Sequence, residues 1–150
     1  MNTLEFVLNT KPYGFEIGQE FASVNQTFSD LSPKRTAHSD LDRTYLKFGS
    51  YGFEMLFESG NLDSVFLYLA SNIRSTSLFS GRFNLLDDDF FQTLSVDIFC
   101  KSMCGRGFTA CKTSYPFAVD FLSSNLRIRL ETRSDQTIIL IDDGSMIREF

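Results

Sequence analysis

The sequence predicts an α+β fold in which two related halves, each a helix followed by an antiparallel meander, share one core. Between residues 46 and 66, apolar residues alternate with polar ones on both sides of glycine-bearing turns, as they do in antiparallel strands. A fainter copy lies at residues 137–146, which align with residues 53–62 without a gap at a displacement of 84 residues. A chain of 150 residues suits one domain, 1–150, with its halves at approximately 14–69 and 87–150.

The first half is expected to begin with two helices. Residues 3–8 are predicted to form a short one, which ends at the Pro and Gly of residues 11–14. The second is indicated by four apolar residues whose spacing places them on one helical face: Ile17, Phe21, Val24 and Phe28. It is expected to end at residues 31–33, because a helix rarely continues into the residue before Pro33. The polar residues 34–43 then read as a loop.

A meander follows this loop, with strands predicted at roughly residues 44–49, 52–58 and 62–69. In its middle strand the side chains alternate, with Phe53, Met55 and Phe57 on one face and Glu54, Leu56 and Glu58 on the other. Ser59-Gly60-Asn61 is predicted to form the second turn, because glycine tolerates the positive φ of a tight hairpin.

The small and polar residues 71–81 are expected to link the halves. The second half then starts with a helix whose apolar positions are Phe90, Phe91, Leu94 and Ile98. Three carboxylates stand at the expected start of this helix, where they complement its dipole, and Gly105 and Gly107 are expected to end it. A strand is predicted at residues 117–121.

A clearer strand is predicted at residues 125–132, with Leu126, Ile128 and Leu130 facing inward and Arg127, Arg129 and Glu131 facing outward. Cross-strand pairing with acidic neighbours such as Glu131, Asp135 and Glu149 accounts for these arginines, and for Arg133 and Arg148, without nucleic acid. The β-branched run at residues 137–141 predicts a strand that is covered on both faces. Asp143-Gly144 is a hairpin signal, after which residues 146–150 are expected to pair back as the terminal strand.

Composition bounds the function classes. The net charge of −5 and the pI near 4.8 argue against a surface for nucleic acid and favour basic protein partners. The N-terminal residues have neither the basic start nor the apolar run of a secretory signal, and no segment is apolar enough to span a membrane. A cytoplasmic location is therefore expected. There, an odd set of cysteines, Cys100, Cys104 and Cys111, favours free thiols over disulfides.

No residue pattern predicts catalysis, a metal site or a cofactor. His38 is the single histidine, and it lies in the polar loop with nothing local to orient it toward a nucleophile. With the three cysteines it would complete a tetrahedral zinc set, but their spacing does not match the usual zinc knuckles. The cysteines are better explained as buried and inert.

Acidic residues are the candidates for partner binding. The run Asp87, Asp88 and Asp89 offers more carboxylates than capping one helix requires. Glu54 and Glu58 project from one face of the meander, near Tyr45 and Lys47 of the preceding strand. The alternative is that these side chains form an ordinary solvated face, or that a helix of the other half covers them.

The segment that carries these residues resembles a known group. Phe15-Glu16-Ile17-Gly18 before a helix, then Tyr45-Leu46-Lys47-Phe48-Gly49, Phe53-Glu54-Met55-Leu56-Phe57 and Gly60-Asn61-Leu62, is similar to small bacterial immunity proteins of polymorphic-toxin and contact-dependent growth inhibition systems. The resemblance covers roughly residues 14–69 well and the closing hairpin less well. Phe48 stands where the pattern usually has Tyr, and residues 73–115 match nothing in it. Immunity proteins share no catalytic residues, so the resemblance implies binding alone.

The leading prediction is therefore a non-enzymatic immunity protein, monomeric when free, that binds and neutralises a cognate toxin domain, a basic nuclease. An acidic protein suits such a target, because opposite charges accelerate capture. The alternative is a structural or adaptor module that self-associates or bridges partners through a sheet edge such as residues 146–150. A third hypothesis is an enzyme that uses Cys104 or Cys111.

Overall fold

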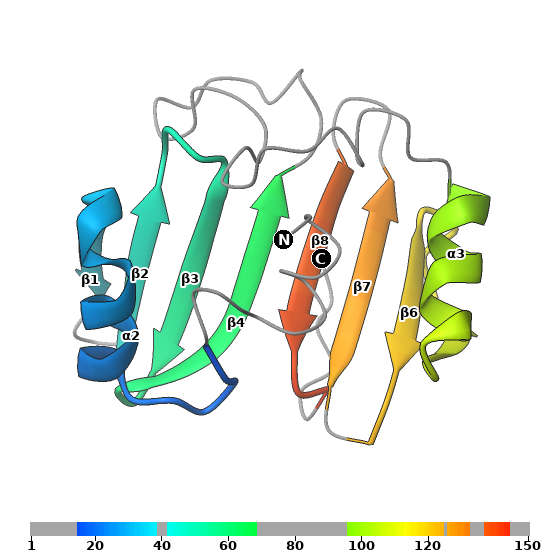
Figure 1. The fold of residues 1–150 in the computed structure, drawn as a ribbon, viewed down its shortest axis with the longest axis horizontal. Helices are drawn as coiled ribbons and strands as arrows, with labels where there is room; N and C mark the ends of the chain where they lie inside the picture. The colour runs from blue at the N-terminus through cyan, green and yellow to red at the C-terminus, as the bar shows by residue number, and fades with distance from the viewer. Residues whose placement is uncertain (1–14, 39–41, 69–95, 125, 133–136, 145–150) are drawn as a thin grey trace.

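The computed structural model describes residues 15–38, 42–68, 96–124, 126–132 and 137–144 (Figure 1). Within these ranges, eight strands form one antiparallel sheet in the order β1-β2-β3-β4-β8-β7-β6-β5. The strands are β1 (Lys34–His38), β2 (Arg43–Phe48), β3 (Phe53–Glu58), β4 (Asn61–Tyr68), β5 (Thr109–Lys112), β6 (Ala118–Leu122), β7 (Arg127–Thr132) and β8 (Thr137–Asp142). The described helices are α2 (Phe21–Phe28), the 3-10 helix η1 (Ser29–Leu31) and α3 (Val96–Gly105).

The predicted α+β class with two related helix-plus-meander halves is wrong. The described chain is dominated by one continuous sheet, whereas α2 has 8 residues and α3 has 10. The sequence underestimated the strands because the outermost two do not alternate: β1 falls in the predicted loop, and β5 was not predicted. Both lie at an edge of the sheet and are largely exposed, so neither has an apolar face to reveal it.

The residue-by-residue repeat is also wrong. A displacement of 84 residues places β3 on β8, but β3 lies between β2 and β4 whereas β8 lies between β4 and β7. Outward from the central β4–β8 pair, strands are added in reverse chain order on both sides, so β8 occupies the position that corresponds to β4. Strands with alternating apolar and polar residues resemble one another in sequence wherever they lie in a sheet. The similarity of residues 53–62 to residues 137–146 therefore did not show which positions these segments occupy.

The central strands and the first described helix are confirmed. β2, β3 and β4 follow the predicted meander within two residues, and the turn at Gly60 has the expected positive φ of 81°. α2 buries Val24 and Phe28, two of its predicted face, but it begins at Phe21, so the predicted position Ile17 lies in the turn before it. β6, β7 and β8 also match predicted strands. The predicted helix at 3–8, the link at 71–81 and the start of the second helix lie outside the described residues.

In the described part of the chain, β8 pairs with two other strands. Residues 146–150 lie outside the described residues, but both sides of β8 are already occupied: residues 138–141 pair with β4, and residues 137–142 pair with β7. The run of β-branched residues in β8 is therefore explained by its central position between β4 and β7.

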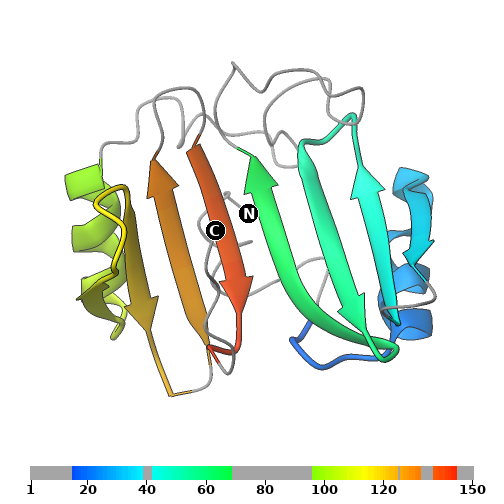
Figure 2. The same ribbon diagram turned by 180° about the vertical axis from the view of Figure 1, so that it is seen from behind.

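Both helices pack on the same face of the sheet, one near each end (Figures 1 and 2). On α2, the Phe28 ring meets Phe48 at 5.7 Å and Phe53 at 6.2 Å between centroids. On α3, Phe99 meets Phe121 of β6 at 5.4 Å. The strand register carries this face across the sheet through Val65, Ile141 and Ile128, all fully buried. The hydrophobic core therefore lies on the helix side.

Candidate functional site

The opposite side of the sheet carries most of the charged side chains of the inner strands, and we call it the helix-free face because no described helix packs on it. Side chains alternate along a strand, so residues next to a core residue point to this face. On β7, for example, Ile128 and Leu130 belong to the core, whereas Arg127, Arg129 and Glu131 lie on the helix-free face. Two regions of this face differ sharply in their exposure.

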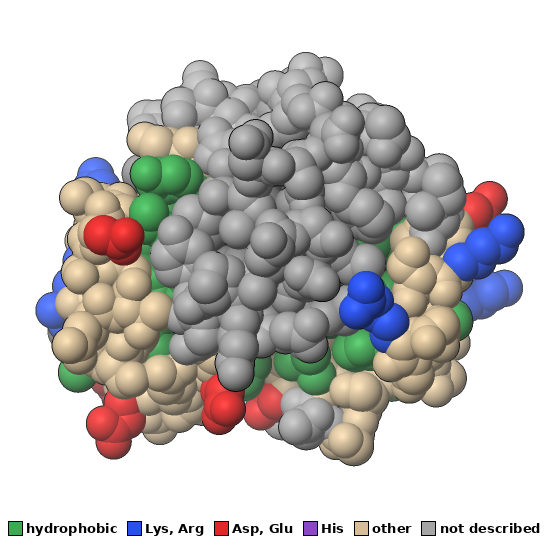
Figure 3. All heavy atoms as spheres, viewed as in Figure 1, with side chains coloured by type: hydrophobic (Ala, Val, Ile, Leu, Met, Phe, Trp, Pro, Cys, Tyr) green, Lys and Arg blue, Asp and Glu red, His purple; other side chains and the backbone are tan. Residues whose placement is uncertain are grey.

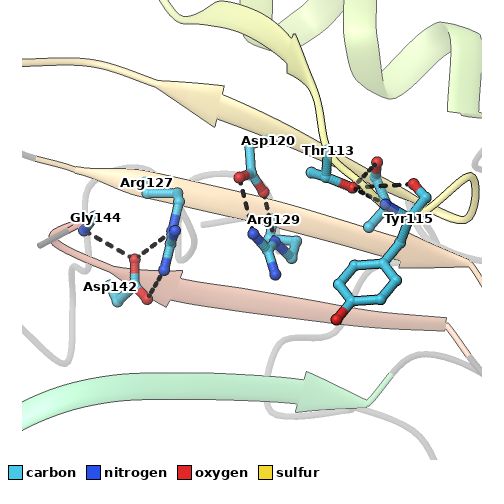
Figure 4. A network of polar contacts seen from close by, with 8 residues as sticks. Thr113, Tyr115, Asp120, Arg127, Arg129, Asp142 and Gly144 are labelled. Carbon is cyan, nitrogen blue, oxygen red and sulfur yellow. Dashed lines mark hydrogen bonds and ion pairs between the residues drawn. The ribbon is translucent and has the colours of Figure 1, made fainter. Parts of the chain in front are cut away.

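Over β6 to β8 two arginines are buried, and each is paired with a carboxylate (Figure 4). Arg127 donates to both carboxylate oxygens of Asp142, from Nε at 2.8 Å and from a terminal nitrogen at 2.6 Å. Arg129 makes the same two-pronged contact with Asp120, at 2.6 and 3.0 Å. The prediction that these arginines pair across strands is confirmed. Their expected solvent exposure is wrong, because Arg127 and Arg129 are 6% and 5% exposed.

The contact with Asp120 favours the charged form of Arg129. The hydrogen bonds accepted by Asp120 raise the pKa of the Arg129 guanidinium, so that this side chain stays charged. Asp142 accepts a third hydrogen bond, from the backbone N–H of Gly144 at 3.0 Å. We therefore interpret these two arginine–aspartate pairs as contacts that stabilise the fold. The sequence did not indicate Asp120 or Asp142 as partners, because the pairs depend on the strand register.

The two glutamates proposed for partner binding also have internal partners. Glu58 of β3 accepts a hydrogen bond from Nε of Arg43 on β2 at 2.8 Å, in a pair whose side chains are 29% and 38% exposed. Glu54 accepts one from the Tyr68 hydroxyl at 2.5 Å. Leu56 between them is buried at 4% exposure. Asp87, Asp88 and Asp89 lie outside the described residues.

Tyr68 links stability to pH. Burial raises its pKa above the usual value of 10.0, and the charge of Glu54 adds to that shift. A raised pKa means that the stabilisation is complete below pH 10 and is lost as the pH rises further, since the unfolded chain then releases the proton first.

Replacing Tyr68 with phenylalanine is therefore expected to have two effects. At pH 7 the free energy of unfolding falls by about 1–2 kcal/mol, because the half-buried Glu54 loses its donor. Between pH 9 and 11 the variant loses less stability than the parent chain. Urea unfolding across this range measures both, and identical pH dependence in the two proteins would contradict the role of Tyr68.

The second region, over β1 and β2, is accessible. It consists of six residues that we call the β1–β2 platform: Lys34, Thr36, His38, Arg43, Tyr45 and Lys47. Lys34 and His38 are exposed and the other four are half-buried. The Tyr45 ring lies edge-on to the His38 ring at 5.7 Å, and Lys47 Nζ lies 5.6 Å from the Tyr45 centroid. An aromatic ring is thus held between two basic side chains on a rigid sheet.

The cysteines and His38 do not converge. Cys100 and Cys104 lie one turn apart on α3, where burial and the neighbouring Cys104 raise the pKa of the Cys100 thiol. Cys111 pairs with Asp120 across β5 and β6 and so belongs to the helix-free face, and His38 is on the opposite edge strand. Among the described residues no three potential ligands are close enough to share a metal ion. The cysteines are also less buried than expected, since Cys104 is exposed.

Comparisons of the chain with protein-family models, with curated proteins and with solved structures found no match. In the described part of the chain, none of the helices has the length and apolar character that crossing a membrane requires.

Proposed function

We propose that this protein is a non-enzymatic, cytosolic immunity protein that binds a cognate toxin domain and blocks its action through the β1–β2 platform. The observation that carries the proposal is the platform itself, where Tyr45 stands between His38 and Lys47 on a helix-free sheet surface. Tyrosine and arginine are enriched where proteins bind each other tightly, because they combine a large contact area with polar groups.

Rigidity supports the same role. The platform side chains project from paired strands, and the β2 backbone is held on both sides by β1 and β3. Such a surface loses little conformational freedom on binding, so more of the contact energy appears as affinity. Arg43 is also oriented in advance by its contact with Glu58.

Charge acts at two distances in this proposal. The net charge of −5 attracts a basic toxin domain such as a nuclease from afar, whereas the platform presents local positive charge to acidic groups within the contact. Association should consequently slow as salt is added.

The test is co-expression with the product of the gene immediately upstream. We expect rescue of growth and a stable complex with the parent chain. Replacing Tyr45 with alanine is expected to weaken the complex at least about tenfold, the usual loss at an energetically dominant contact residue. The matched control is Lys112→Ala, an exposed position at the other edge of the sheet, which should bind as the parent does. A complex that is unaffected by Tyr45→Ala would place the interface elsewhere.

A second candidate, an adaptor that self-associates, is favoured by one observation. Among the described strands, β1 and β5 lie at the two ends of the sheet and each pairs on one side only, and such edges can pair with another chain. Absence of rescue and of a complex, together with a concentration-dependent dimer in sedimentation, would support this candidate over the immunity role.

A further inference from the structure

We propose that β1 is a docking edge for an extended acidic segment of a protein partner, which adds to the sheet as a strand beside it. The proposal deepens the function above, because it names the chemistry that the β1–β2 platform recognises. It stands on the position of β1 in the sheet and on the unusual pairing of charges across β1 and β2.

β1 is the outermost strand on its side of the sheet. Its five residues pair with β2, from Lys34 with Lys47 to His38 with Arg43, and no described strand pairs with its other side. Four of the five residues are exposed. The outer backbone groups of β1 are therefore placed to accept a further strand, the arrangement by which many proteins bind extended peptides.

The formally charged side chains of β1, Lys34 and Arg35, are both cations. One of the five cross-strand pairs places two lysines directly opposite each other, Lys34 with Lys47, whereas Arg43, opposite His38, is paired with Glu58. Like charges in this position destabilise a sheet. Arg35 adds a further cation on the opposite face of β1, where its guanidinium lies 4.6 Å from the Phe21 centroid. Figure 3 shows Lys and Arg side chains at this left end of the molecule. An acidic neighbour would offset the repulsion.

A strand beside β1 would present its own side chains alternately to the two faces. Acidic residues four positions apart would lie opposite Lys34 and His38 on the helix-free face, about 13 Å from one another. A residue between them would meet Arg35 on the helix side. The edge thus favours a partner segment with carboxylates at positions i and i+4.

Other occupants fit less well. A second copy paired antiparallel about Thr36 would set Lys34 against His38 and so bring further cations to the edge. Nucleic acid has phosphates for the cations but no backbone that continues a sheet, and the net charge of −5 repels it. An acidic peptide segment satisfies both the charges and the backbone groups.

The probe is a blocked seven-residue peptide with glutamate at its second and sixth positions and threonine or valine elsewhere. Titration into the full-length, isotope-labelled protein should shift the backbone amide signals of residues 34–38 in a saturable way. A peptide with lysine in place of both glutamates should bind at least about fivefold more weakly, since a lysine opposite Lys34 replaces attraction with repulsion. A peptide N-methylated on the amides that face β1 should not bind.

Lys34→Glu separates docking from a purely protective role, in which charge only prevents edges from aggregating. The variant keeps an exposed charge on the edge and should remain monomeric, but it should lose affinity for the glutamate peptide and gain affinity for the lysine peptide. Lys112→Glu on β5 is the matched control and should leave peptide binding unchanged.

Unshifted amides at residues 34–38 up to millimolar peptide, or equal binding of the N-methylated peptide, would overturn the proposal. So would a single-stranded oligonucleotide that binds residues 34–38 more tightly than the glutamate peptide. These outcomes differ from failure of the proposed function. If the protein rescues growth but does not bind the peptide, the immunity role is supported and the docking edge is contradicted. If it binds the peptide but does not rescue growth, the docking edge is supported and the immunity role is contradicted.

Discussion

Replacing Arg127 with alanine is expected to lower the free energy of unfolding by about 3–5 kcal/mol. The Arg127 and Asp142 side chains are 8% and 3% exposed, and their contact is two-pronged. The substitution leaves the Asp142 carboxylate buried without its cation, and a buried unpaired charge is among the most costly defects that a protein can contain. Urea unfolding at pH 7 measures the loss.

Arg43→Ala is a closely matched control. Arg43 also donates from Nε at 2.8 Å to a carboxylate directly across the strand pair, but its side chain and that of Glu58 are 38% and 29% exposed. Water screens this pair, so the variant should lose less than about 1 kcal/mol. Equal losses in the two variants would show that burial does not set the strength of these pairs.

The double variant Arg127→Met with Asp142→Leu tests the reason for the loss. It removes both charges and fills their volume with apolar groups, which in buried sites is often neutral or stabilising. We expect it to recover most of the stability lost in Arg127→Ala. A double variant as unstable as the single one would indicate that the cost comes from lost packing rather than from the isolated carboxylate.

Replacing Phe28 with alanine is expected to cost a further large amount, about 3–5 kcal/mol, through the cavity that it creates. Phe28 is fully buried at the end of α2, and its ring contacts Phe15, Phe48 and Phe53 within 6.4 Å between centroids. It therefore joins the helix, the segment before it and two strands. Without the Phe28 ring, the rings of Phe15, Phe48 and Phe53 lose the side chain that all three contact.

Two controls accompany this prediction. Phe28→Leu keeps much of the volume and should cost about half as much as Phe28→Ala. Leu122→Ala removes an apolar side chain that is 38% exposed on β6, and should change the free energy of unfolding by less than about 0.5 kcal/mol. A Phe28→Ala variant that unfolds like the parent would contradict the placement of α2 on the sheet.

Local pattern was enough to predict some elements. The inner strands β2, β3 and β4 alternate, and the turn between β3 and β4 contains Gly60 at a positive φ. The periodicity of Val24 and Phe28 likewise predicted α2. In each case, the sequence signal and the structural constraint involve residues within a few positions of one another.

The candidate site was harder to predict. Glu54 and Glu58 were selected because they alternate with apolar residues, and both face partners that no local pattern reveals, Tyr68 and Arg43. The β1–β2 platform was missed because residues 34–38 are polar on both sides of the strand. An edge strand has no apolar face, so its sequence resembles that of a loop.

By itself, the sequence of this protein determined which residues enter the core and where the tight turns fall, because side-chain hydrophobicity and glycine conformation act locally. Only the tertiary structure decided that β4 and β8 join all eight strands into one sheet, that Arg127 and Arg129 are buried with their carboxylates, and that β1 carries a basic edge. Each of these results depends on strand order and register. Alternation specifies the face on which a side chain lies but not the strand beside it, and that choice is made by contacts between residues far apart in the chain.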